Sequence, residues 1–143
     1  MKTEQKVQAV ILDKSSNRIL LLRRYDYYYK KKPFWRLVKG GVEKNESSRQ
    51  ALRREIKEET GLKKIIISKK IHEYIYFDPR NIKMKVRCYI VFADKNDKII
   101  PDKKEGIVGF KWVSLKLAYR LLKYKDEKDT IKKLLNHFPF SKQ

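Results

Sequence analysis

The stretch that decides the fold is residues 40–62, GGVEKNESSRQALRREIKEETGL. Ser47, followed three residues later by Gln50, forms the pattern of a capping box at the start of a helix. Gly61 is typical of the residue just beyond a helix C-terminus, because glycine adopts the left-handed backbone conformation without steric penalty. These signals predict a helix of roughly three to four turns over residues 48–60.

The predicted helix places acidic side chains beside apolar ones. On a helical wheel of about 100° per residue, three glutamates fall within an arc of about 100° on the side of Ala51 and Leu52. These glutamates are Glu55, Glu58 and Glu59. Carboxylates at such spacings repel one another, and partial burial strengthens the repulsion and raises their pKa values. A hard divalent cation such as Mg²⁺ would relieve the repulsion, because it binds oxygen ligands. The alternative for three glutamates alone is a solvated acidic patch.

The whole stretch resembles the Nudix box in every fixed position. Besides two aliphatic positions, the matching residues are Gly40, Glu46, Arg54, Glu55, Glu58, Glu59 and Gly61. This resemblance implies an α/β fold, the Nudix α/β/α sandwich, in which a mixed sheet lies between the box helix and the C-terminal helix. It also implies a single domain over residues 1–143, a length sufficient for one hydrophobic core and too short for two.

The resemblance further implies a reaction and roles for individual residues. The reaction is hydrolysis of a phosphoanhydride bond in a nucleoside diphosphate linked to another group, with Mg²⁺ or Mn²⁺ stabilising charge on phosphate oxygens. The implied metal ligands are Glu55, Glu58, Glu59 and the backbone carbonyl of Lys39. Either Glu55 or Glu58 is implied as the general base, and Arg54 can pair with Glu58 and orient it. Glu105, in a later loop, is a second candidate for base or ligand, and an ordinary loop charge is its alternative explanation.

Three stretches look like the diadenosine tetraphosphate hydrolases of this family: residues 35–41, WRLVKGG, residues 71–76, IHEYIY, and residues 121–124, LLKY. Val38 departs from a proline that is usual there, and residues 44–45 depart from a usual Pro-Gly. The likeness implies a dinucleoside polyphosphate substrate. Tyr74 and Tyr76 would then stack on adenine, and Lys39 would hold a phosphate.

Hydrophobic patterns predict the remaining elements. The predicted strands are residues 6–12, 18–22, 34–38, 64–77, 82–93 and 108–113, with a hairpin turn at residues 78–81. Two further helices are predicted, one over residues 115–122 with Ser114 as its N-cap, and one that begins at Asp126 or Lys128 and ends near Leu135.

The long hairpin carries both aromatic and basic side chains. Tyr74 and Tyr76 share one face of its first strand, because side chains alternate along a strand. The basic residues on one face of its second strand are Lys83, Lys85 and Arg87. If the two faces coincide, the hairpin offers rings for stacking and cations for phosphate. The alternative is a solvated sheet face with cross-strand pairs.

Residues 23–33, RRYDYYYKKKP, hold four tyrosines and five basic residues without a clear period, and are predicted as a loop. The tyrosines, Tyr28 among them, could stack on a base while the lysines meet phosphates. An exposed, locally packed loop without a ligand is the alternative.

Charge and cysteine content limit the class of protein. Lys and Arg number 37 against 17 Asp and Glu, and the formal charge of +20 favours nucleotides, polyphosphates or an RNA 5′ end as ligands. The alternative explanation of this charge is a Lys-rich surface typical of a protein from a thermophile, without a polyanionic ligand. The single cysteine, Cys88, excludes an internal disulfide, and no stretch resembles a signal peptide or a membrane span. We therefore expect a cytoplasmic protein away from membranes, and no obligate protein partner can be inferred.

Two rival functions remain at this point. The first is the same chemistry on RNA 5′-triphosphate ends, ADP-ribose or oxidised guanine nucleotides, among which the charge favours RNA. The second is a non-catalytic Nudix module that binds nucleotides or RNA. The intact set of Glu55, Glu58 and Glu59 argues against the second, because a protein without activity has no reason to retain a repulsive carboxylate cluster.

Overall fold

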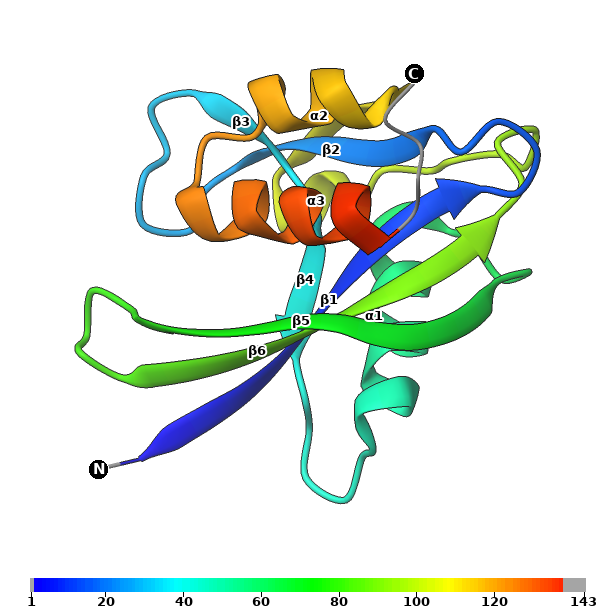
Figure 1. Cartoon of the computed structure of the whole chain (residues 1–143). Coiled ribbons are helices and arrows are strands. Elements are labelled where there is room, and N and C mark those ends of the chain that lie inside the picture. The colour runs from blue at the N-terminus through cyan, green and yellow to red at the C-terminus, as the bar shows by residue number, and fades with distance from the viewer. Residues whose placement is uncertain (1, 138–143) are drawn as a thin grey trace.

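The computed structural model describes residues 2–137 and shows one mixed sheet with helices on both faces (Figure 1). The strands are β1 (Thr3–Asp13), β2 (Ile19–Tyr25), β3 (Pro33–Arg36), β4 (Val38–Gly41), β5 (Ile66–Phe77), β6 (Lys83–Ala93) and β7 (Ile107–Val113). The helices are α1 (Ser48–Thr60), α2 (Leu115–Leu121) and α3 (Lys125–His137), with a 3-10 turn η1 (Lys103–Glu105). None of the helices in this described part of the chain has the length and hydropathy needed to cross a bilayer.

The sheet is organised around β1. Its strand order is β3-β2-β1-β6-β5, while β4 pairs with β1 and β7 pairs with β2. The β1–β6 pair is parallel and the other pairs are antiparallel, so the sheet is mixed. This arrangement confirms the α/β fold expected from the sequence.

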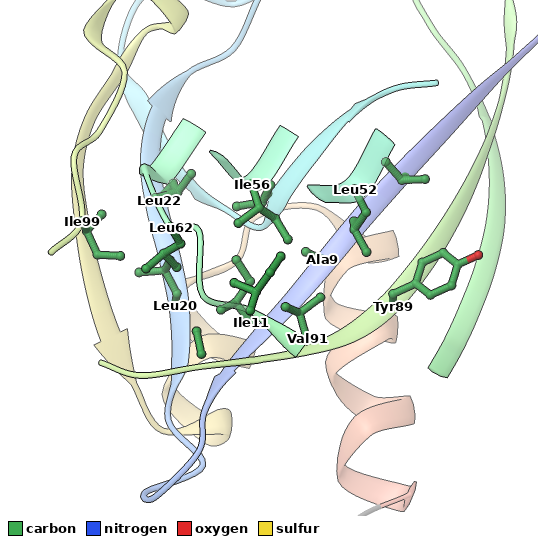
Figure 2. Close-up of a cluster of buried hydrophobic side chains, with 14 of the residues drawn as sticks. Ala9, Ile11, Leu20, Leu22, Leu52, Ile56, Leu62, Tyr89, Val91 and Ile99 are labelled. Carbon is green, nitrogen blue, oxygen red and sulfur yellow. The ribbon is translucent and has the colours of Figure 1, made fainter. Parts of the chain in front are cut away.

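Two hydrophobic clusters lie on opposite faces of the sheet, because alternate residues of β1 enter different clusters. Figure 2 shows the cluster under α1, where Leu52 and Ile56 pack against Ile11 of β1 and Leu22 of β2. The other cluster joins Leu12 of β1 to buried residues of α2 and α3. Each fully buried leucine or isoleucine contributes about 1.5–3 kcal/mol to folding, so both layers are held mainly by apolar burial. The sandwich is therefore confirmed.

Helix α1 has the predicted bounds and caps. The Ser47 hydroxyl accepts from the Gln50 amide at 3.1 Å, and the Gln50 side chain accepts from the Ser47 amide at 2.8 Å. Gly61 ends the helix in the left-handed region with φ 79°. Ser114 likewise caps α2 by accepting from the Leu117 amide at 3.2 Å. Local signals therefore position the residues that follow.

The predicted strand over residues 34–38 is wrong, because the chain breaks into β3 and β4 at Leu37. The Leu37 amide leaves the sheet ladder and donates to the Glu127 carboxylate of α3 at 2.9 Å. After this break β4 pairs with β1, with Gly40 opposite Val7. Strand β4 thereby lies beneath α1 and brings Gly40 to the helix.

The loop predicted over residues 23–33 is shorter than expected. Strand β2 continues to Tyr25, pairing with both β3 and β7, so Arg23 and Arg24 belong to the sheet. The connecting loop between β2 and β3 comprises residues 26–32. This extension gives Arg24 a fixed position, which matters for the site described next.

Candidate functional site

Glu55 lies directly over Gly40 of β4. A Cβ atom built on Gly40 would come within 1.9 Å of the Glu55 Cδ and 2.2 Å of its Oε2, far closer than atoms approach in real structures. Only glycine leaves room for the carboxylate at this strand position. The side chain of Glu55 is 13% exposed, so its carboxylate is largely withdrawn from solvent.

Glu59 is the most buried carboxylate of α1, at 3% exposure. Burial raises its pKa to about 8; the Arg24 guanidinium opposes that shift, and the charge of Glu55 and a hydrogen bond to Glu55 add to it. The Arg24 Nη1 lies 3.1 Å from the Glu59 Oε1. Glu55 and Glu59 thus form a close carboxylate pair in which burial and mutual repulsion disfavour a second negative charge.

Arg54 ties the box together. Its guanidinium contacts both Glu46 oxygens at 2.8 and 2.9 Å, the Glu55 carboxylate at 2.8 Å and the Gly41 carbonyl at 2.7 Å. These hydrogen bonds lower the pKa of Glu46 to about 2 and raise the pKa of Arg54. The predicted contact with Glu58 exists at 3.4 Å but is the weakest in the set. Arg54 therefore orients Glu55 more strongly than Glu58.

Glu58 lies apart from the carboxylate pair. Its side chain is 51% exposed, against 13% for Glu55 and 4% for Glu59. Across residues 2–137, no three acidic, histidine or cysteine side chains converge closely enough to hold a metal ion. The pair Glu55–Glu59 still fits a hard divalent cation, because two adjacent, poorly solvated carboxylates beside an open glycine strand are the oxygen donors that such ions prefer.

A cavity of about 910 Å³ lies between the 26–32 loop, the end of the β5–β6 hairpin and the start of α3, and neither Glu55 nor Glu59 lines it. The structure brings four predicted substrate-binding residues to its wall: Tyr28, Lys39, Tyr74 and Tyr76. Arg24 also lines it, and is the same residue that hydrogen-bonds Glu59. One guanidinium therefore connects the cavity with the carboxylate pair.

Lys39 and the hairpin tyrosines form one contact chain in the cavity. The Lys39 ammonium donates to the Tyr76 hydroxyl at 3.1 Å, and the Tyr76 and Tyr74 rings lie 6.3 Å apart. Tyr74 donates to the Gln8 side chain at 3.3 Å. Burial, with the nearby Arg36 charge, lowers the pKa of Lys39 to about 8. Lys39 is still mostly protonated at pH 7, so it presents a cation in the cavity.

The hypothesis that the basic and aromatic faces of the hairpin coincide is wrong. Tyr74 pairs with Val86 and Tyr76 with Met84, so both rings share the apolar face of β6. The basic residues of β6 pair with Glu73, Ile75 and Phe77 on the other face. They are Lys83, Lys85 and Arg87. Lys85 and Arg87 lie 3.6 and 3.5 Å from Glu73, which is a cross-strand charge network on a solvated face.

Glu105 lies on the exposed η1 turn, just before β7. The Tyr25 amide donates to the neighbouring Gly106 carbonyl at 3.0 Å, which fixes this turn beside the end of β2. The turn is thus near Arg24 along the sheet, and the side chain of Glu105 faces solvent.

The sequence led to no predicted role for three residues of the site. Arg24 reads as one more loop cation, and its role depends on β2 extending to Tyr25. Arg36 donates to the buried Glu127 at 2.6 Å, and Glu127 also accepts from the Leu37 amide. Glu127 alone had a weak signal, since a glutamate in the first turn of a helix is favourable there.

Comparison with known proteins identifies the family to which this chain belongs. The NUDIX domain family model matches residues 3–137. The RNA pyrophosphohydrolase of Pelagibacter ubique is 30% identical over 149 residues, which cover 91% of this chain and 92% of that protein. The dihydroneopterin triphosphate diphosphatase of Haemophilus influenzae is 30% identical, covering 94% of this chain and 89% of that protein. A C. elegans Ap4A hydrolase, solved as a binary complex, matches with a TM-score of 0.77 and 22% identity over 94% of this chain and 99% of that chain, and this likeness shows the shared fold.

Proposed function

This chain belongs to the Nudix family of hydrolases, and from that premise we propose that it hydrolyses a phosphoanhydride bond in a dinucleoside polyphosphate such as diadenosine tetraphosphate. The observation that carries the proposal is the position of Arg24, which lines the tyrosine cavity and hydrogen-bonds Glu59. A nucleotide whose base occupies the cavity would therefore direct its phosphates past Arg24 to the carboxylate pair of α1. The cavity volume lies at the upper end of the roughly 300–1,000 Å³ of small-molecule sites, which suits a large nucleotide.

Glu55 and Glu59 are the proposed metal ligands, together with the carbonyl of Lys39 and with Glu58 as a third, more exposed carboxylate. Mg²⁺ or Mn²⁺, when bound, supplies positive charge that stabilises the phosphate oxygens and makes a bound water a better nucleophile. Gly40 leaves the space that Glu55 needs, and Arg54 holds Glu55 in orientation through a 2.8 Å hydrogen bond. The protein thus positions its carboxylates before any substrate arrives.

The general base is proposed among Glu55, Glu58 and Glu105. Glu58 is exposed, adjacent to Glu59 in sequence and about one helical turn from Glu55, so it can reach a water molecule without giving up a buried contact. Glu105 lies on the η1 turn, which the hydrogen bond from the Tyr25 amide to the Gly106 carbonyl holds beside the end of β2. Glu58 is therefore our first choice, and Glu105 our second.

The cavity residues are proposed to bind the nucleotide and its phosphates. Tyr74, Tyr76 and Tyr28 offer rings for stacking, which is worth about 1–3 kcal/mol per base in single-strand binders. Lys39 offers a cation already held in place by the Tyr76 hydroxyl. Binding here would order the substrate without taking part in the chemical step.

A second candidate substrate is a triphosphorylated RNA 5′ end. The specific observation in its favour is the RNA pyrophosphohydrolase relative, which is 30% identical across nearly the whole of both chains. The formal charge of +20 agrees with a polyanionic substrate of this kind. Both candidate substrates would be hydrolysed at the same carboxylate pair. They differ in the part of the substrate outside the cavity, which is a second nucleoside in one case and an RNA chain in the other.

A substrate panel separates these functions. The purified protein would be assayed with Mg²⁺ against diadenosine tetraphosphate, 5′-triphosphate RNA, ADP-ribose, an oxidised guanine nucleotide and dihydroneopterin triphosphate, with kcat/KM compared. We expect diadenosine tetraphosphate to give the highest value. A higher value for 5′-triphosphate RNA would favour the second candidate, and hydrolysis of none of the five would refute the proposal.

A further inference from the structure

The mouth of the cavity carries two exposed tyrosines and a half-buried phenylalanine with lysines over their rings, a group that we name the aromatic rim. It comprises Tyr27, Tyr29 and Phe34 with Lys30, Lys32 and Lys123. Tyr27 is 76% exposed and Tyr29 41% exposed, although both also line the cavity. Rings exposed to this degree at the edge of a cavity typically mark a binding surface.

The rim is a built arrangement rather than a set of unrelated side chains. Tyr29 and Phe34 stack with centroids 5.6 Å apart and planes at 26°. The Lys123 ammonium, from the segment between α2 and α3, lies 3.8 Å from the Phe34 centroid and 5.2 Å from that of Tyr29. The loop and the helical layer therefore meet at these rings.

The lysines of the rim are available to an anionic chain. Lys30 lies 5.5 Å from the Tyr27 centroid and Lys32 lies 5.6 Å from that of Phe34. A lysine over a ring gains only about 0.5–1 kcal/mol at an exposed site, so it can turn to a phosphate at little cost. The one acid in this loop, Asp26, is already engaged by the Tyr124 hydroxyl at 2.5 Å and by Arg36 at 3.7 Å.

We propose that the aromatic rim is a binding site for a single-stranded nucleic acid chain that continues outward from the nucleotide in the cavity. Exposed rings beside cations are the combination that binds single strands, because rings stack on unpaired bases and cations follow the phosphates. Bases within a duplex are already stacked on one another, so the rim favours single strands over duplexes. This inference rests on the second candidate substrate of the proposed function, and it names the residues that would hold the chain beyond the first nucleotide.

The test measures binding of a labelled single-stranded RNA of about 12 nucleotides that ends in a 5′-hydroxyl, so that no hydrolysable phosphoanhydride is present. Fluorescence anisotropy gives Kd for the wild type, for Lys30→Glu/Lys32→Glu and for Tyr27→Ala/Tyr29→Ala. The matched control is Lys63→Glu/Lys64→Glu, two exposed lysines between α1 and β5 that receive the same change of charge. Thermal unfolding of each variant shows that it folds.

We expect Lys30→Glu/Lys32→Glu to weaken binding at least tenfold and to lower the slope of log K against log salt by about 0.7 for each phosphate that the protein no longer neutralises. Loss of a stacking ring should weaken binding about 5- to 150-fold. The control should weaken binding less than threefold and leave the salt slope unchanged. Equal losses of affinity in the rim and control variants would overturn the inference. So would tighter binding to the same sequence as a duplex, or binding to phosphatidylserine vesicles in place of RNA.

A parallel assay of diadenosine tetraphosphate and 5′-triphosphate RNA hydrolysis keeps the two proposals separate. If the wild type hydrolyses either substrate and the rim variants bind RNA normally, the rim inference fails and the proposed function stands. If the rim variants lose RNA binding while the wild type hydrolyses neither substrate, the proposed function fails and the rim stands as a binding surface.

Discussion

The Glu55 carboxylate carbon lies 1.9 Å from the place that a Cβ atom on Gly40 would occupy. Gly40 and Glu55 are fifteen positions apart in sequence. Where β4 contacts α1, the missing side chain of Gly40 leaves the space that the Glu55 carboxylate fills. The backbone of Gly40 is not in the left-handed region, so space rather than conformation requires glycine here. The separation of Gly40 and Glu55 in the box therefore reflects the close approach of β4 to α1.

We expect Gly40→Ala to lower kcat by about 100-fold, because the new methyl group displaces Glu55 and a shift of about 1 Å in a catalytic group has that effect. Thermal stability should change little, since the displaced atoms are the end of a flexible side chain. Gly41→Ala is the matched control, because its Cβ would meet only Lys6 Nζ at 3.7 Å, an ordinary contact. Equal loss of activity in the two variants would contradict this explanation.

We expect Glu59→Gln to lose at least about 100-fold in kcat, the scale expected for removing a central electrostatic group. The wild type should likewise lose activity in excess chelator and recover it when Mg²⁺ or Mn²⁺ is restored. Glu43→Gln serves as a control, because the Glu43 side chain is 65% exposed and pairs with Arg54 at 3.3 Å. Full activity of the wild type in chelator would refute the metal-dependent mechanism.

We expect Tyr76→Ala to raise KM for diadenosine tetraphosphate about 5- to 150-fold while kcat at saturation stays nearly intact, because the ring would stack on a base. Tyr76→Phe keeps the ring and should raise KM much less, although it removes the hydroxyl that accepts from Lys39. Tyr74→Ala should also lower Tm, since the Tyr74 hydroxyl donates to Gln8. An unchanged KM in both alanine variants would show that these tyrosines only pack the sheet.

We expect Lys85→Ala/Arg87→Ala to leave KM within about twofold of the wild type, because these cations face Glu73 on the side of the hairpin away from the tyrosines. Lys6→Ala provides the comparison, since Lys6 lines the cavity. Its KM should rise with little change in kcat, the signature of lost ground-state binding. A larger KM effect in the Lys85/Arg87 variant would place the phosphates on the opposite face.

We expect the Asp13 carboxylate to make the free energy of unfolding depend on pH in the acidic range. Burial disfavours its charge, but hydrogen bonds from Ser15, Ser16 and the Lys95 amide hold its pKa at about 2, below the usual 3.8. The carboxylate therefore stabilises the fold fully above pH 3.8, and its contribution disappears as pH falls towards 2. Urea unfolding should show Asp13→Asn less stable than the wild type at pH 7, with the difference shrinking between pH 4 and 2. A constant difference would contradict this assignment.

The parts of the fold that local sequence determines were predictable. The capping box at Ser47, the Gly61 terminus and the turn at residues 78–81 each depend on contacts within a few residues, and each appears as expected. The faces of the hairpin were not predictable, because alternation assigns sides within one strand only. Which residue of β6 lies opposite Tyr74 is set by the register of the turn, and bulges near Lys70 shift the pairing further along.

The contacts that assemble the site join residues far apart in sequence. Arg24 meets Glu59 across 35 positions, and Leu37 meets Glu127 across 90. Neither pair has a periodic or spacing signal. The second pair also explains why the strand expected over residues 34–38 is divided into β3 and β4. The sequence of this segment does not indicate that the Leu37 amide will donate a hydrogen bond to a side chain of α3.

Arg24 is positioned to couple the binding of a divalent cation to the binding of a polyphosphate. Its single guanidinium hydrogen-bonds Glu59 and also lines the cavity, so a polyphosphate that draws Arg24 away removes a positive charge that repels a cation at Glu59. A divalent cation would then bind more tightly, and a bound cation would in turn release Arg24 to the polyphosphate. By thermodynamic reciprocity each ligand must raise the affinity of the other by the same factor, so Kd for the cation measured with and without a non-hydrolysable nucleotide gives the size of this cooperativity.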